Sequence, residues 1–225
     1  MLSLKPASLL QTGTSLAELL VAIAVSLIVL IGMTTVTVTS LHRSRDNLMT
    51  IRLEEQLRAA IDIMTNDIQR AGYWKNASTD IGQNTNSNPF MASGADISIP
   101  SSSCILFTYD HNNTGSLPTI NTGTDDDRYG YRLSGGAIQT RPVTAAFDCA
   151  AGAGAWENLT DPNVVNISSL QFTTIPAAGY QVVTVGSHTV TIREIQIKIT
   201  GSLVSDSSVS RTVTEKVRVR NDKYN

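Results

Sequence analysis

An unbroken apolar run near the N-terminus is the strongest pattern in the sequence. From Leu16 to Val38 almost every position is apolar, and a helix of about 20 such residues crosses a bilayer. A cleaved secretory signal has an apolar core of only about 7 to 15 residues. Although Ala22-Ile23-Ala24 resembles a signal-cleavage site, the apolar sequence continues past it. We therefore predict a membrane-spanning helix over residues 14–38.

A second helical pattern follows the apolar run. Its apolar residues recur at steps of three, four and one, as on one face of a helix: Leu53, Leu57, Ala60, Ile61, Met64, Ile68 and Ala71. Glu54 and Arg58 on another face have the favourable i, i+4 spacing, and Gly72 is a candidate C-cap. These features predict that residues 39–72 extend the helix as an amphipathic segment. The places expected to bend or melt locally are Gly32 and residues 34–39.

The rest of the chain, residues 73–225, alternates apolar and polar positions as β-strands do. Residues 76–103 are rich in Asn, Ser, Thr and Gly and predict a long surface connection. The predicted strands are 104–109, 128–133, 137–141, 164–175, 180–185, 190–199 and 213–220, with a hairpin at Ser134-Gly135-Gly136. An antiparallel sheet packed on the C-terminal half of the helix is the simplest architecture, which is an α+β fold with a β-rich head.

Two irregularities interrupt the alternation of the last strands. The apolar positions slip by one residue between Ile192 and Ile195, and a bulge near Arg193 and Glu194 would account for this slip. In the final strand Glu215 falls on the apolar side. A charged residue there predicts an edge strand or a functional contact.

Charge and cysteine content narrow the class of protein. The net charge is −2 and charged residues make up 16% of the chain, so nothing indicates a surface for nucleic acid. The chain has two cysteines, Cys104 and Cys149, both far from the apolar run. In an exported head these would form one disulfide, whereas in a cytosolic protein they would be two separate buried thiols.

Signatures of catalysis are missing from the sequence. It contains no G-x-S-x-G, H-E-x-x-H or glycine-rich phosphate loop, and its three histidines (His42, His111 and His188) are scattered. We therefore expect a protein that is not an enzyme and has no cofactor.

One loop suggests a calcium site. Asp110, Asn112 and Thr114 alternate before Gly115, as in oxygen-rich calcium loops, and Asp125, Asp126 and Asp127 follow nearby. However, the twelfth position of such a loop would be Asn121 rather than a bidentate glutamate. A turn rich in Asp, Asn and Gly is the alternative, and it needs no metal.

The apolar run contains one residue that is costly in a membrane. An ionised Glu18 near mid-bilayer would cost several kcal/mol, although close to the membrane edge the side chain can reach the interface. Read in order, Gly13-Thr14-Ser15-Leu16-Ala17-Glu18 resembles the processing site of type IV prepilins. That family has a glycine before the cut, an apolar third mature residue and a glutamate at the fifth, followed by an apolar helix.

The resemblance implies a role for each residue of this motif. Residues 1–13 would be a leader that prepilin peptidase removes between Gly13 and Thr14, and Thr14 would be the candidate for N-terminal methylation. Glu18 would neutralise the new Thr14 amine in a medium of low dielectric constant, where such attraction is strong, and so support filament assembly. The sequence departs from the family in having Thr14 where phenylalanine is usual, and only Lys5 as a basic residue in the leader.

Scattered segments of the head resemble the PilW family of minor type IV pilins. They are Arg70-Ala71-Gly72-Tyr73, residues 104–110, Tyr129-Gly130-Tyr131-Arg132-Leu133, Gly136-Ala137-Ile138, Leu159-Thr160-Asp161-Pro162 and Val217-Arg218-Val219-Arg220. This resemblance implies a type IV pilin fold and a low-abundance subunit that primes pilus assembly, near the filament tip. Its partners would be other minor pilins, the major pilin, prepilin peptidase, the inner-membrane assembly platform and the lipid bilayer.

Under this interpretation the chain is a single-pass inner-membrane protein with a periplasmic head, which becomes extracellular in the assembled pilus. Two alternatives share the same features. One is the J-type minor pseudopilin of a type II secretion system. The other is a signal-anchored periplasmic binding or adhesive protein without a filament role.

Overall fold

The computed structural model describes residues 13, 15–80, 87–119, 126–143, 145–150 and 156–224. The chain forms two compact units, Met1–Leu48 and Met49–Asn225. In the first unit the structure is helical from Leu16 onward, and the second unit, called the head below, contains the rest of the helix and all the described strands. The leader predicted over residues 1–13 lies outside the described residues except for Gly13, and Thr14 lies outside them too.

Helix α1 (Leu16–Ile68) is continuous. It remains helical at Gly32 and through residues 34–39, so the local melting predicted there is not observed. Threonine hydroxyls in this stretch donate hydrogen bonds to carbonyl oxygens three or four residues earlier, which satisfies them inside the helix. The pairs are Thr34 to Ile31 (2.9 Å), Thr37 to Met33 (2.9 Å) and Thr39 to Thr35 (2.8 Å).

The helix ends at Ile68, four residues before the predicted C-cap. The next turns are tighter, because the Arg70 N–H donates to the Asp67 carbonyl (3.0 Å) and the Ala71 N–H to that of Ile68 (3.1 Å). The Gly72 N–H instead donates to the Thr108 carbonyl at 2.7 Å. Gly72 does have the positive φ of a cap (+73°), but its partner lies in the sheet and not in the helix.

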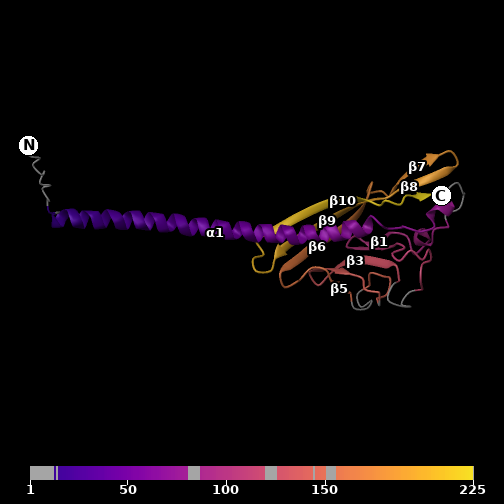
Figure 1. Cartoon of the computed structure of the whole chain (residues 1–225), viewed down its shortest axis with the longest axis horizontal. Helices are drawn as coiled ribbons and strands as arrows, with labels where there is room; N and C mark the ends of the chain where they lie inside the picture. The colour runs from indigo at the N-terminus through magenta and orange to yellow at the C-terminus, as the bar shows by residue number, and fades with distance from the viewer. Residues whose placement is uncertain are drawn as a thin grey trace, which may run out of the picture. The chain divides into compact units, whose positions relative to one another are not determined.

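The described strands form three antiparallel sheets, with orders β1-β2-β3-β4-β5, β10-β9-β6 and β11-β8-β7 (Figure 1). Two 3₁₀ turns, η1 (Ala77–Asp80) and η2 (Pro89–Met91), precede them. The strand bounds are β1 Ser98–Ser101, β2 Cys104–Thr108, β3 Arg128–Ser134, β4 Ala137–Thr140, β5 Glu157–Asn158, β6 Val165–Ile175, β7 Gln181–Val185, β8 His188–Ile192, β9 Glu194–Leu203, β10 Ser210–Arg218 and β11 Lys223–Tyr224.

The predicted bulge at Arg193 and Glu194 is wrong. Strand β8 ends at Ile192 and β9 begins at Glu194, and the two strands belong to different sheets. The slip in the apolar alternation therefore marks a change of sheet at Arg193. Periodicity reports that the inward-facing positions shift, but it does not say which strands pair on either side of the shift.

The edge position predicted from Glu215 is confirmed. Strand β10 is the outer strand of its sheet and pairs only with β9 among the described strands. Glu215 is exposed, so its carboxylate stays in water. It alternates with Val213 and Val217 on the same face of β10.

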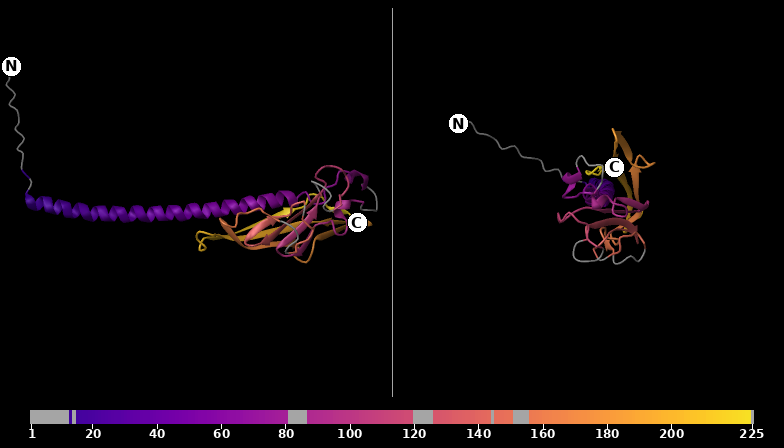
Figure 2. Two further views of the ribbon diagram at one scale, coloured as in Figure 1. Left: turned by 90° about the horizontal axis from the view of Figure 1, so that it is seen from below. Right: turned by 90° about the vertical axis from the view of Figure 1, so that its right-hand side faces the viewer.

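The apolar stripe of α1 forms one side of the head's core. All seven residues predicted for this stripe are buried. They pack in one cluster with inward-facing side chains of β6 and β9, which run alongside this part of the helix (Figures 1 and 2). The strand residues are Val165, Ile167, Leu170, Phe172, Ile195, Ile197 and Ile199. The fold is thus α+β, with a long N-terminal helix packed on antiparallel sheets, as predicted.

Gly72 offers a test of how tightly the helix end is packed. A Cβ there would lie 2.6 Å from Met91 Cε and 2.8 Å from Arg193 Nη2, whereas at Gly94, which also has positive φ (+83°), it would meet nothing within 4 Å. Alanine at Gly94 is expected to cost about 1 kcal/mol from backbone strain alone. Alanine at Gly72 is expected to cost about 1 to 3 kcal/mol more from overpacking. Chemical denaturation of both variants measures the difference, and equal costs would contradict the packing described.

Candidate functional site

The first turn of α1 holds the predicted assembly residue. The Glu18 carboxylate accepts a hydrogen bond from the Ser15 N–H (3.0 Å), and the Ser15 carbonyl accepts the helical bond from the Leu19 N–H (3.2 Å). Ser15 is therefore the N-cap, and Glu18 stands at the third helical position, as in a capping box. The sequence interpretation missed this role, although the Ser-x-x-Glu spacing signals it. Gly13 is exposed and outside the helix.

The side chains of α1 in the first unit are exposed. Leu16 is 77% accessible, Ile28 70% and Val36 71%. In the described chain one helix, α1, is long and apolar enough to cross a membrane, and none of its most apolar window is buried. An apolar surface of this length needs a lipid or protein environment. The first part of α1 is therefore a candidate membrane anchor.

The loop of Asp110, Asn112 and Thr114, which the sequence suggests as a calcium site, is closed by its own hydrogen bonds. Asp110 is 1% accessible, and its carboxylate accepts the N–H groups of Lys75 (3.0 Å), Thr114 (2.9 Å) and Gly115 (3.0 Å). The side-chain oxygen of Asn112 also accepts the Thr114 N–H, at 3.1 Å. These bonds favour the turn interpretation, because they fold the backbone onto oxygens that a metal would otherwise use.

The acidic residues that follow this loop have structural partners. Asp126 forms a buried ion pair with Arg141 (2.7 Å), and Asp127 accepts the His111 N–H at 3.0 Å. Asp125 lies outside the described residues. Among the residues that the structure describes, no group of three or more His, Cys, Asp or Glu is placed to hold a metal ion.

Cys104 and Cys149 are joined in a disulfide, which ties the start of β2 to the segment after β4. Cys104 is buried in a small second core with Leu106, Ala145 and Trp156. The Arg132 guanidinium lies 4.5 Å from the centre of the Trp156 ring, a cation–π distance. The remaining histidines are exposed: His42 lies in α1 and His188 begins β8.

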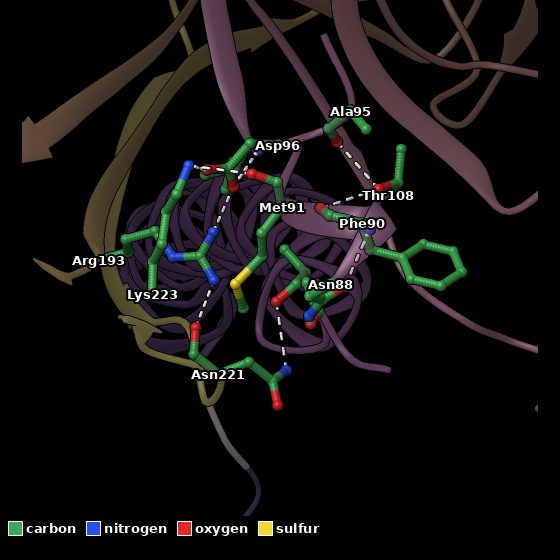
Figure 3. A network of polar contacts seen from close by, with 12 residues as sticks. Asn88, Phe90, Met91, Ala95, Asp96, Thr108, Arg193, Asn221 and Lys223 are labelled. Carbon is green, nitrogen blue, oxygen red and sulfur yellow. Dashed lines mark hydrogen bonds and ion pairs between the residues drawn. The ribbon is translucent and has the colours of Figure 1, made fainter. Parts of the chain in front are cut away.

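A polar network around the buried Arg193, not anticipated from the sequence, includes Asp96, Asn221 and Lys223 (Figure 3). The Arg193 side chain is 1% exposed and forms an ion pair with Asp96. It also donates to the Asn221 carbonyl. Asp96 in turn pairs with Lys223 at 2.9 Å. Burial lowers the pKa of the Arg193 guanidinium, and the Asp96 carboxylate opposes that shift.

The same network supplies donors to the carbonyl groups that follow α1. The Asn221 amide donates to the Ala71 carbonyl (3.2 Å) and the Asn88 amide to that of Gly72 (2.9 Å). The Arg220 N–H donates to the Gln69 carbonyl at 3.0 Å. These carbonyl groups belong to the turns that follow the helix, and segments distant in the sequence supply their hydrogen-bond donors.

Comparison with known proteins identifies the family. Residues 46–219 match the family described as prepilin peptidase-dependent protein B. The chain belongs to this family. Prepilin peptidase-dependent protein B of Escherichia coli (strain K12) is 24% identical over 193 residues, which cover 85% of this chain and 94% of that protein. No solved structure matches the chain significantly. Membership places the chain in a pilin-related family, and the match to the family begins after the N-terminal motif.

The ion pair of Arg193 and Asp96 can be compared with an exposed pair in the same unit. Replacing Asp96 by alanine leaves a buried guanidinium without its carboxylate, which is expected to cost about 3–5 kcal/mol. Replacing Glu54 breaks a pair with Arg58 whose side chains are 63% and 41% exposed. This change is expected to leave stability almost unchanged, because water and salt screen exposed pairs. Denaturant unfolding of both variants tests this. Similar small losses would mean that the network does not stabilise the head.

Metal removal tests the turn interpretation of the Asp110 loop. Because backbone N–H groups already hold the Asp110 carboxylate, EDTA is expected to leave the thermal unfolding midpoint of the head unchanged, and added calcium is expected not to raise it. A midpoint that falls with EDTA and returns with calcium would show that the loop holds a cation.

Proposed function

We propose that this chain is a minor pilin that takes part in type IV pilus assembly, primes initiation and lies near the filament tip. The main support for this proposal is the structure at the start of α1. The exposed apolar helix begins at Leu16, directly after the Gly13-Thr14 motif, with Glu18 in its first turn. Membership in the family of prepilin peptidase-dependent protein B supports processing by that peptidase. The PilW-like segments of the head support the narrower role of a minor, tip-proximal subunit.

In this proposal the first part of α1 crosses the inner membrane and the head lies in the periplasm until the subunit enters the pilus. The chain acts through assembly and not through catalysis. Its partners are the other minor pilins, the major pilin, prepilin peptidase and the assembly platform of the inner membrane. After cleavage, Thr14 carries a positive amine one residue from Ser15, whose N–H binds the Glu18 carboxylate. We therefore propose that Glu18, bound to the neighbouring Ser15 N–H, neutralises that charge.

Two variants of Glu18 separate its charge from its capping bond. Glutamine keeps an oxygen that can accept the Ser15 N–H but loses the charge, whereas alanine loses both. If neutralisation of the amine drives assembly, both variants are expected to be inserted and cleaved normally but to be strongly depleted from sheared pili. Immunoblots of membrane and pilus fractions measure this. Wild-type levels of Glu18→Ala in the pili would refute the assembly role.

The glutamine variant decides between the two roles. Recovery of Glu18→Gln in pili, with Glu18→Ala absent, would assign assembly to the cap instead of the charge. The location of the wild-type chain distinguishes the pilus from other destinations, since a J-type pseudopilin would co-purify with a secretion pseudopilus. A signal-anchored binding protein would be found with neither.

A further inference from the structure

In the part of the chain that the structure describes, the hairpin of β7 and β8 has one strand edge without a partner strand. Strand β7 pairs with β8, β8 pairs with β11, and β7 is the outermost strand of this sheet (Figure 1). The hairpin turn has two residues, Gly186 and Ser187, between the paired Val185 and His188. Gly186 has φ of +65°, as the first position of a type II′ turn requires.

The register of the hairpin determines which backbone groups face outward. Residues that flank a two-residue turn form a hydrogen-bonded pair, and such pairs alternate along an antiparallel ladder. The pairs Val185–His188 and Val183–Val190 therefore exchange hydrogen bonds within the hairpin. The N–H and C=O groups of the intervening Val182 and Thr184 point away from β8, toward the open edge.

Among the residues that the structure describes, this edge lacks the features by which proteins prevent strand addition. Those features include charged side chains, prolines, bulges and covering segments. Strand β10, another edge, has four charged side chains: Arg211, Glu215, Lys216 and Arg218. Strand β7 has the sequence Gln-Val-Val-Thr-Val, without a charge, a proline or a register shift. Val182 and Val183, which point to opposite faces, are 59% and 36% accessible.

We propose that β7 is a docking edge for β7 of a second copy of this chain. An antiparallel pair centred on Val183 places Val182 opposite Thr184 of the other copy. The outward-facing groups of both residues then form four backbone hydrogen bonds across a two-fold axis. Because β7 is uncharged, no like charges meet at that axis. The two sheets become one sheet of six strands.

The side chains on one face of the sheet support this arrangement. Val183 is paired with Val190, and Val190 with Tyr224 of β11, so these three lie in one row. Tyr224 is 62% accessible. In the joined sheet the two Val183 side chains are direct neighbours, and the row continues across the axis. Cross-strand pairs of β-branched and aromatic residues stabilise sheets. The pairing needs no filament, so it does not depend on the function proposed above.

Cysteine cross-linking of the full-length protein in its membrane tests the pairing. Both natural cysteines are in the disulfide, so Val183→Cys adds the one free thiol. At the axis it faces its counterpart in a non-hydrogen-bonded pair, the closer of the two kinds. Mild oxidation is expected to double the mass of Val183→Cys on non-reducing gels. Thr214→Cys on the charged edge strand β10 is the matched control and is expected to remain a monomer.

Two variants that block the edge complete the test. The Val182 N–H points outward, so Val182→Pro removes donors to the second copy without breaking the β7–β8 ladder. Val183→Lys places like charges at the axis and keeps every backbone group. Light scattering of the detergent-solubilised chain is expected to give a two-chain mass for the wild type and a one-chain mass for both variants. Circular dichroism monitors their fold.

Several results would overturn the proposal. A one-chain mass for the wild type would do so, as would a two-chain mass that persists in folded Val183→Lys. Equal cross-linking of Val183→Cys and Thr214→Cys would show collision without a specific interface. Cross-linking of Val183→Cys to a polypeptide of different mass would assign the edge to another partner.

Discussion

The burial of one face of α1 between Leu53 and Ile68 is the interaction on which the head depends. A helix in a protein gains most of its stability from packing of its amphipathic face and little from intrinsic propensity. Strands β6 and β9 provide that packing surface. Leu53, Leu57, Met64 and Ile68 are fully buried. Each buried side chain of this size contributes about 1.5–3 kcal/mol from removal of apolar surface from water. The sheet β10-β9-β6 in turn buries Leu170, Phe172, Ile195, Ile197 and Ile199 in the same cluster as the helix stripe.

The polar network at Arg193 and its neighbouring residues supply hydrogen-bond donors to the carbonyl groups that follow the helix. The helix ends inside the head, and where the carbonyl groups of the turns that follow it are buried they need donors. The C-terminal segment supplies these through Arg220 and Asn221, and Asn88 supplies another. Arg193 can be buried there because Asp96 and the Asn221 carbonyl accept its hydrogen bonds. The point where the chain changes sheets is thereby joined to the end of the helix.

Local patterns in the sequence were sufficient to predict the helix stripe and most strands. The stripe from Leu53 to Ala71 was predicted residue by residue because helical periodicity directly reports a buried face. The edge position of β10 followed from a single charged residue, Glu215, on its apolar side. The Ser-x-x-Glu spacing also signals the capping bond between Ser15 and Glu18. The sequence interpretation assigned Glu18 only to neutralising the Thr14 amine.

The errors concern features that depend on distant segments. Gly72 was predicted to cap the helix, but Thr108 of β2 takes its N–H. Arg193 was assigned to a bulge because a change of sheet and a bulge produce the same one-residue slip. The network of Asp96, Asn221 and Lys223 could not be predicted, because nothing in a single sequence indicates which distant polar residues meet in a core. The open edge of β7 is also a property of the sheet order and not of the strand's own sequence.

The functional interpretation joins these parts. The head matches a pilin-related family, and the exposed apolar helix is a candidate membrane anchor. The role of Glu18 in filament assembly is our proposal. The N-terminal residue and intact mass of the mature protein, purified from membranes, test this interpretation most directly. Our account predicts a chain that begins at Thr14. A chain that begins after Ala24, or one that retains Met1, would contradict it.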